Sequence, residues 1–202
     1  EGRDLLALKP EELRALRGAR IGMIFQEPMT ALNPLMRVAD QIAEVLQVHG
    51  VRPGNRVAEL IAAVGLPDPA RIARSYPHQL SGGQRQRVMI AIALALEPAM
   101  LVADEPTTAL DVTTQMQILR LIKSIQRRRG MGVIFITHDF GVVAEIADRV
   151  AVMQHGRIVE TGTAQEVLNA PAHPYTRALI RAVPRFDGQA PARIAHLEAR
   201  MR

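Results

Sequence analysis

The chain has 202 residues, of which 48% are hydrophobic and 22% are charged, as is typical of one globular domain that can bury a core. Cysteine is absent, which excludes disulfides, thiolate metal sites and cysteine-ligated iron–sulfur clusters. The formal net charge is +5, but aromatic residues make up only 3% and tryptophan is absent. We therefore attribute the charge to scattered surface arginines and expect no nucleic-acid partner. No run of about 18 uncharged apolar residues occurs, so we expect no transmembrane helix.

The first predicted strand covers residues 21–25, which are short, apolar and β-prone, and a proline-containing loop follows it up to residue 34. The helical spacing of apolar residues then predicts helices over 38–48 and 56–64. Prolines and two glycines interrupt the chain before a long apolar helix predicted over 88–96. Between residues 35 and 96 the sequence thus predicts an all-helical insert.

From residue 100 onward the pattern changes to alternating strands and helices. Strands are predicted over 100–103 and 133–136, helices over 112–129 and 140–147, a hairpin over 150–153 and 157–160, and two further helices over 162–169 and 176–183. Fully apolar strands that alternate with helices favour a parallel sheet covered on both faces. Prolines interrupt the last part, which we interpret as a C-terminal extension.

The segment Leu80 to Arg87, with the sequence LSGGQRQR, precedes the apolar helix. Ser81 and Gln84 match a capping box, and this local role is one explanation of the motif. A capping box does not require Gly82 and Gly83, each of which costs about 1 kcal/mol in helix propensity. Glycines let the backbone lie flat against a ligand, and the amides at a helix N-terminus favour an anion. The segment therefore predicts a phosphate cradle.

Two carboxylates follow the apolar strand at 100–103, namely Asp104 and Glu105. Taken alone, they could be solvated acids at the end of a strand. Mg²⁺ prefers hard oxygen ligands and keeps several waters, so Asp104 would suffice as its carboxylate. Glu105 would then accept a proton from an attacking water. A phosphate cradle and a carboxylate pair together indicate a nucleotide hydrolase.

Three segments together resemble motifs of the ATP-binding-cassette (ABC) ATPases. They are LSGGQ, the signature motif; LVADEPTTALD at 101–111, the second nucleotide motif with its D-loop; and IFQEP at 24–28, the Q-loop. The resemblance implies an α/β nucleotide-binding domain of the P-loop NTPase type, with a mostly parallel sheet, flanking helices and a helical subdomain. It also implies four regions: a partial catalytic core with the Q-loop (1–34), the helical subdomain that ends in the signature helix (35–97), the catalytic core (98–168) and a C-terminal extension (169–202).

The resemblance also implies a role for each site residue, with ATP and Mg²⁺ as cofactors. The catalytic residues would be Glu105 as the base, His138 as the contact to the γ-phosphate and the attacking water, and Gln26 as the sensor that reaches Mg²⁺ beside Asp104. The nucleotide-binding residues would be Ser81, Gly82, Gly83, Gln84 and Asp111. The local alternatives are a helix N-cap for Asp111 and ordinary loop positions for His138 and Gln26.

The C-terminal part narrows the resemblance to one branch. HPYTRAL at 173–179 and AVP at 182–184 resemble the extension of peptide-type importer ATPases, a branch that includes dipeptide, oligopeptide, glutathione and nickel systems. This implies an ATP-hydrolysing subunit on the cytoplasmic side of the membrane. Its partners would be a second ATPase subunit arranged head to tail, transmembrane permeases and, indirectly, an external solute-binding protein. The imported solute does not follow from these motifs.

The phosphate loop of this family, G-x-x-x-x-G-K-[ST], does not occur in the 202 residues, whose only lysines are Lys9 and Lys123. The chain also begins with Glu1 rather than Met. We therefore expect an N-terminally truncated domain that does not bind ATP with normal affinity alone and exposes a sheet edge and part of its core. Two alternatives stay open. One is a DNA-repair or chromosome-type ABC ATPase, which the short insert between Gln26 and Ser81 disfavours; the other is a non-catalytic scaffolding fragment.

Overall fold

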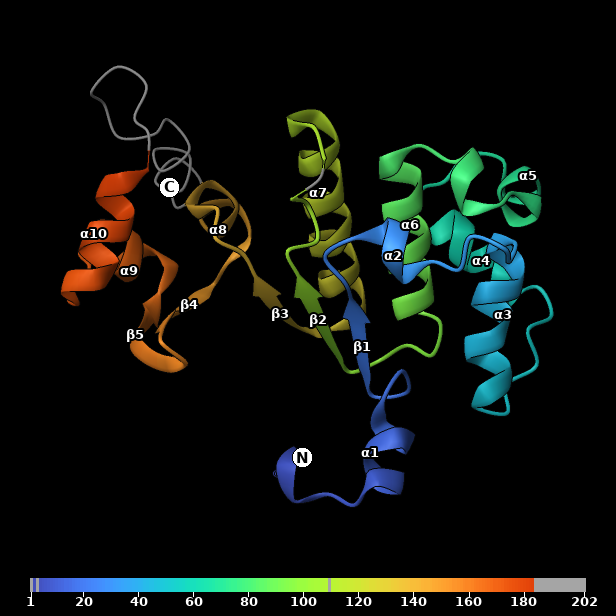
Figure 1. Ribbon diagram of the computed structural model, residues 1–202, viewed down its shortest axis with the longest axis horizontal. Helices are drawn as coiled ribbons and strands as arrows, with labels where there is room; N and C mark the ends of the chain where they lie inside the picture. The colour runs from blue at the N-terminus through green and yellow to red at the C-terminus, as the bar shows by residue number, and fades with distance from the viewer. Residues whose placement is uncertain (1, 3, 109, 184–202) are drawn as a thin grey trace. The chain divides into compact units, whose positions relative to one another are not determined.

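The computed structural model describes residues 2, 4–108 and 110–183, and the chain divides into two compact units after Ile136 (Figure 1). The first unit contains η1 (Leu5–Ala7), α1 (Pro10–Leu16), β1 (Ile21–Ile24), α2 (Pro28–Ala31), α3 (Val38–Val48), α4 (Arg56–Ala63), α5 (Pro69–Arg74), η2 (Pro77–Gln79), α6 (Gly82–Ala93), β2 (Met100–Asp104), α7 (Val112–Arg129) and β3 (Gly132–Ile136). The second contains α8 (Phe140–Ile146), β4 (Arg149–Gln154), β5 (Arg157–Thr163), α9 (Ala164–Asn169) and α10 (Pro174–Ala182).

The three strands of the first unit form a parallel sheet in the order β1-β2-β3. This confirms the predicted parallel sheet. Across it, Ile24 pairs with Ala103, and Ala103 pairs with Phe135. Because the strands are parallel, their carboxyl ends lie at one edge of the sheet, where β2 delivers Asp104 and then Glu105.

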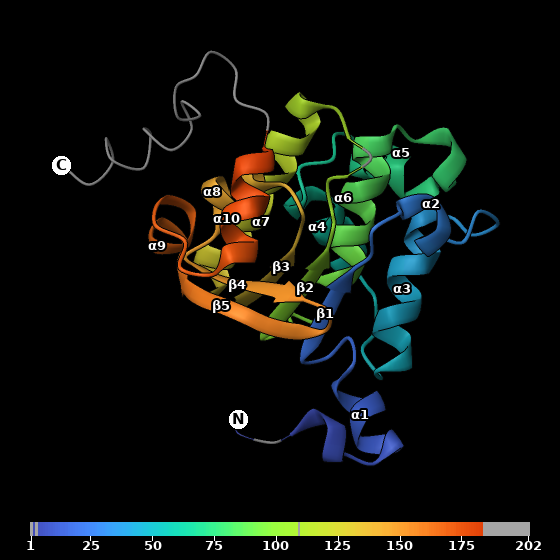
Figure 2. The same cartoon turned by 60° about the vertical axis from the view of Figure 1, so that its left-hand side comes forward.

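One face of this sheet packs against helices of the same unit, and Figure 2 shows α6 and α7 on that side. The sheet and α6 approach closely at Gly22 of β1, where an added Cβ would stand 2.4 Å from the carbonyl oxygen of Ala93 at the end of α6. Only glycine permits that distance. The covering helices bury their apolar stripes, and four side chains of α7 are at most 3% exposed: Ile118, Leu119, Ile122 and Ile125.

The opposite face of the sheet carries apolar side chains that are partly exposed. Met23 is 40% exposed, Met100 38%, Ile134 49% and Ile136 46%. These side chains alternate along their strands with the buried ones, so they share the second face. Among the described residues of the first unit, helices cover one face of the sheet. The prediction of a sheet covered on both faces is therefore confirmed for that face only.

The helical insert is confirmed by α3, α4, α5, η2 and α6, which share a core that includes Ile42, Ile61 and Ile72. The sequence pattern does not predict α5, because prolines lie within and beside it. Asp68 adopts a left-handed backbone (φ 49°), and its side chain accepts a hydrogen bond from the Arg71 amide. Proline at the first helical position then starts α5, since its missing N–H has no helical partner to lose there. Two other short helices, α1 and α2, were also not predicted.

The second unit is built on the predicted hairpin, in which β4 and β5 pair antiparallel. Its turn residues, His155 and Gly156, both have positive φ (48° and 75°), as a two-residue hairpin turn requires. Helices α8 and α9 pack around a small apolar core that contains Ala144, Ala164 and Leu168. No helix in the described part of the chain has both the length and the apolarity to cross a bilayer.

Candidate functional site

Two site residues that lie 79 positions apart meet at the carboxyl ends of β1 and β2. The amide nitrogen Nε2 of Gln26 donates a hydrogen bond of 3.1 Å to Oε2 of Glu105. The contact follows from the strand register, because Ile24 and Ala103 are paired and each precedes one of the two residues by two positions. The structure therefore brings together the Q-loop glutamine and the carboxylate predicted as the base.

Glu105 is held in an unusual backbone conformation. Its φ is 42°, in the left-handed region, and its amide donates to the carbonyl oxygen of Ile136 at 3.0 Å. A left-handed non-glycine residue costs about 1 kcal/mol or more and persists only where its surroundings fix it. Its side chain receives a second hydrogen bond, 2.9 Å long, from Oγ1 of Thr108. The carboxylate is thus fixed from two directions at the end of β2.

Asp104 is the last residue of β2, and its side chain is half-buried at the same edge. Gln26 uses its nitrogen for Glu105, which leaves the amide oxygen Oε1 out of that bond. One carboxylate and one amide oxygen match the hard donors that Mg²⁺ takes from protein while keeping several waters. Within residues 2, 4–108 and 110–183, no group of three or more acidic or histidine side chains forms a closed metal cage. These two donors fit the chemistry that Mg²⁺ prefers.

The signature segment forms the N-terminus of α6. Oγ of Ser81 accepts from the Gln84 amide at 3.3 Å, and Oε1 of Gln84 accepts from the Ser81 amide at 3.0 Å. This reciprocal pair confirms the capping box. Ser81 is exposed, and Gly82 and Gly83 are half-exposed, so the turn is not buried in its own core.

The two glycines of the signature differ in what surrounds them. A Cβ on Gly83 would lie 2.6 Å from Cγ2 of Thr114 in α7, so Gly83 is required by the packing of α6 on α7. A Cβ on Gly82 would lie 3.8 Å from the Leu110 side chain, an ordinary contact. Nothing within the described chain therefore requires a glycine at position 82. A ligand or partner that approaches the backbone there would explain it.

Asp111 caps α7 beside this contact. Its Oδ1 accepts from the Thr114 amide at 2.9 Å, and its Oδ2 accepts from Oγ1 of Thr114 at 2.7 Å. The Thr114 hydroxyl and then the Thr114 amide hold the pKa of Asp111 below its ordinary value. The helix-cap alternative for Asp111 is confirmed, and the side chain of Thr114 connects Asp111 to the signature glycine.

His138 belongs to the second unit, unlike the other predicted site residues. It is exposed in a short segment before α8, where Oγ1 of Thr137 accepts from the Asp139 amide at 3.0 Å. Asp139 caps α8 by accepting from the Gly141 amide at 2.7 Å. These local bonds fix the turn that carries His138.

Sequence reasoning missed two residues whose side chains fix parts of the site or the chain next to it, Thr108 and Gln41. Thr108 stood inside LVADEPTTALD, but no periodic or charge signal distinguished its hydroxyl. Gln41 lies on α3, is 6% exposed, and fixes the chain after the Q-loop. It accepts from the Asn33 amide and donates to the carbonyl oxygens of Asn33 and Met36, each at 3.0 Å. A polar residue directly before Ile42 on the apolar face of a helix was the available signal.

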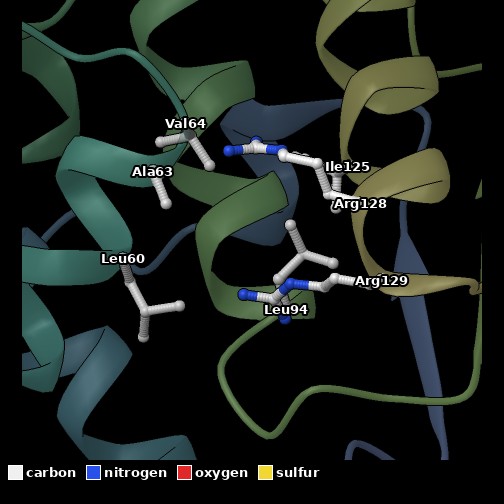
Figure 3. Close-up of a pocket in the computed structure, with 7 residues that line it drawn as sticks. All are labelled: Leu60, Ala63, Val64, Leu94, Ile125, Arg128 and Arg129. Carbon is white, nitrogen blue, oxygen red and sulfur yellow. The ribbon is translucent and has the colours of Figure 1, made fainter.

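A separate cavity of about 110 Å³ lies between α4, α6 and α7 (Figure 3). Its wall is apolar and includes Leu60, Val64 and Leu94, and the guanidinium groups of Arg128 and Arg129 extend across it. Arg129 lies 3.8 Å from Glu97, which also pairs with Arg56. The cavity contains none of the predicted site residues.

Comparison with known proteins places this geometry in a family. Residues 1–108 match the family described as ABC transporter, and residues 159–201 match the oligopeptide/dipeptide transporter C-terminal region. Among solved structures, a dimeric ATP-binding cassette in a post-hydrolysis state, bound to ADP and Pi, is 33% identical with a TM-score of 0.68. The alignment covers 78% of this chain and 68% of the chain in that structure.

Curated relatives are closer in sequence. The oligopeptide transport ATP-binding protein OppD of Lactococcus lactis is 56% identical over 185 residues, which are 90% of this chain and 55% of that protein. The dipeptide transport ATP-binding protein DppD of Bacillus subtilis is 52% identical over 191 residues, 93% of this chain and 57% of that protein. The glutathione import ATP-binding protein GsiA of Escherichia coli K12 is 58% identical over 181 residues, which are 87% of this chain and 29% of that protein. The chain thus spans 57% or less of the length of these relatives. Because the family match covers residues 1–108, more than half of the chain, the chain belongs to the ABC transporter family.

Proposed function

We propose that this chain is part of an ATP-hydrolysing subunit that energises an ABC importer of peptides or related small solutes. The single observation that carries the proposal is the hydrogen bond between Gln26 and Glu105, which unites the Q-loop with the proposed base. The names of the relatives support a peptide-class system, since they are transport ATP-binding proteins for oligopeptides, dipeptides and glutathione. The match of residues 159–201 to an oligopeptide/dipeptide transporter region supports the same class.

The residues divide the chemistry among themselves. Asp104 and Oε1 of Gln26 would hold Mg²⁺, which supplies charge neutralisation for the phosphates when bound. Glu105, fixed at the strand end, orients the attacking water and accepts its proton. His138 would contact the γ-phosphate from the turn before α8. A phosphate loop would come from residues outside these 202, because no Gly-Lys pair occurs within them.

The exposed turn Ser81–Gln84 would face a nucleotide held by a second ATPase subunit. A head-to-tail dimer would place this turn and Asp111 at the shared interface, with the helix N-terminus of α6 directed at the phosphates. The helical region 35–97 and the loop after Gln26 would contact transmembrane permeases. The subunit, which includes the core region 98–168 and the extension 169–202, would then work at the cytoplasmic face of the membrane.

The proposal is tested on the polypeptide encoded by the complete reading frame that contains these residues. We expect Mg²⁺-dependent release of phosphate from ATP, and we expect Glu105→Gln to abolish turnover and to accumulate an ATP-bound dimer on size-exclusion chromatography. Glu44→Gln, an exposed carboxylate on α3, is the matched control and should behave as the wild type. Normal turnover by Glu105→Gln would disprove the assignment of the base. Salt-sensitive DNA binding without ATPase coupling to import would favour the DNA-repair alternative.

A further inference from the structure

Two hydrogen-bond donors converge on the same oxygen of Glu105. Oγ1 of Thr108 lies 2.9 Å from Oε2, and Nε2 of Gln26 lies 3.1 Å from it. We propose that Thr108 is a positioning residue for the hydrolysis step, whose hydroxyl holds the Glu105 carboxylate in the orientation from which it receives the proton of water. This inference rests on the proposed function.

The two donors come from different parts of the fold, and this distinguishes their roles. Thr108 is three residues beyond Glu105 in the same turn, where its amide also donates to the Glu105 carbonyl oxygen at 3.3 Å. Gln26 comes from the loop after β1, 79 residues away. A movement of that loop toward Mg²⁺ would remove the Gln26 bond and leave the Thr108 bond intact. Thr108 is therefore the donor that stays with Glu105 throughout the cycle.

The need for such a donor follows from the backbone of Glu105. Its positive φ directs the side chain out of the regular strand path, so the strand itself does not fix the carboxylate. A hydrogen bond from a hydroxyl to an ionised carboxylate is stronger than one between neutral groups, and it sets the plane of the acceptor. A displacement of about 1 Å in a catalytic group can lower a rate a hundredfold. The Thr108 hydroxyl thus acts on the rate through Glu105, without touching the substrate.

A purely structural role for Thr108 predicts different measurements. In any variant except proline, the Thr108 amide can still donate to the Glu105 carbonyl oxygen. If the hydroxyl serves only to stabilise the turn, its removal should change the melting temperature. A positioning role instead lowers kcat and leaves the KM for ATP and the melting temperature unchanged. It also predicts rescue by serine, which keeps the hydroxyl and lacks the methyl group.

The test compares Thr108→Val, which keeps the shape and removes the hydroxyl, with Thr108→Ser in the polypeptide of the complete reading frame. We expect valine to lower kcat roughly tenfold or more, as for loss of a bond to a charged group, and serine to restore it to within about threefold of the wild type. Thr161→Val, at an exposed threonine of β5 in the second unit, is the matched control. If valine lowers the melting temperature, the kcat values of the valine and serine variants are compared at a temperature at which both variants are fully folded.

Three results would overturn the inference. They are a kcat for Thr108→Val within twofold of the wild type, a loss in Thr108→Ser equal to that in valine, or a loss that disappears when activity is corrected for the unfolded fraction. A wild-type protein without ATPase activity would overturn the proposed function, and this inference with it. An active wild type with a normal valine variant would overturn the inference alone.

Discussion

The methyl group Cγ2 of Thr114 lies 2.6 Å from the point where a β-carbon on Gly83 would stand. The same threonine bonds to both carboxylate oxygens of Asp111 through its amide and its hydroxyl. Gly83 at the start of α6 and Asp111 at the start of α7 are therefore coupled through one side chain. Because Gly83 and Thr114 are closely packed, a shift of one helix end should require a shift of the other.

Gly83→Ala should destabilise the protein by about 1–3 kcal/mol, the cost typical of overpacking, even though alanine is the better helix former. The clash is with a methyl group, so Thr114→Ser, which keeps the hydroxyl for Asp111, should remove most of this cost. Urea unfolding of the two single variants and the double variant gives the coupling energy. An equal cost of Gly83→Ala in both backgrounds would show that the clash is not its cause.

Gly82→Ala should behave in the opposite way. Its new Cβ meets only an ordinary contact at 3.8 Å, so the melting temperature should stay the same or rise slightly. If a nucleotide on a second subunit approaches this backbone, ATP-dependent dimerisation and hydrolysis should fall at least tenfold. Analytical ultracentrifugation with and without ATP measures the first effect. Unchanged dimerisation and hydrolysis would remove the reason for a glycine at this position.

Asp111 should contribute to acid sensitivity. Its pKa is lowered in the folded protein, so the stabilisation from this carboxylate is complete above the ordinary aspartate pKa of about 4 and is lost as the pH falls through the lowered value. Asp111→Asn keeps a cap for the Thr114 amide but does not titrate. The difference in unfolding free energy between wild type and variant should therefore shrink between pH 6 and pH 3. A difference that stays constant over that range contradicts the prediction.

Gln41→Leu should loosen the chain between Asn33 and Met36, because it removes the side-chain bonds to the Asn33 amide and to the carbonyl oxygens of Asn33 and Met36. Of these three groups, the Asn33 oxygen still accepts from the Met36 amide. We expect a loss of about 1–3 kcal/mol in stability and faster amide hydrogen exchange at residues 33–36. Gln47→Leu, an exposed glutamine on the same helix, is the control and should change neither quantity. Exchange that is unchanged in Gln41→Leu would mean that the loop is fixed by other contacts.

The sequence was most informative where a regular period met a strong terminal signal. Helix α7 begins and ends at the predicted residues, because Asp111 caps its start and Gly130 in a left-handed conformation ends it. Short helices were missed for the opposite reason: α2 and α5 contain prolines, and four to six residues show no reliable period. The strand boundaries differ from the predicted ones by one to three residues: β1 is one residue shorter than predicted, and hydrogen bonding across the sheets extends the other four strands.

At the site, motif spacing identified residue types but not their partners. The bond between Gln26 and Glu105 depends on strand register, which no local pattern encodes. The different requirements at Gly82 and Gly83 depend on how closely α7 approaches, and the adjacent letters in the sequence are identical. The roles of Thr108 and Thr114 depend on hydroxyl directions, which are set only after the turns have formed.

The partly exposed apolar face of the three-stranded sheet can be compared with the buried face by mutation. Leu101 is 1% exposed, so Leu101→Ala should lower the free energy of unfolding of this chain substantially. Ile134→Ala or Ile136→Ala should lower it only slightly, because both side chains are partly exposed. If additional polypeptide shields that face in a longer protein, the isoleucine changes should destabilise that protein more than they destabilise this chain, whereas the leucine change should destabilise both equally. The difference between the two molecules then reports, for each side chain, how much stability its burial under the shielding segment contributes.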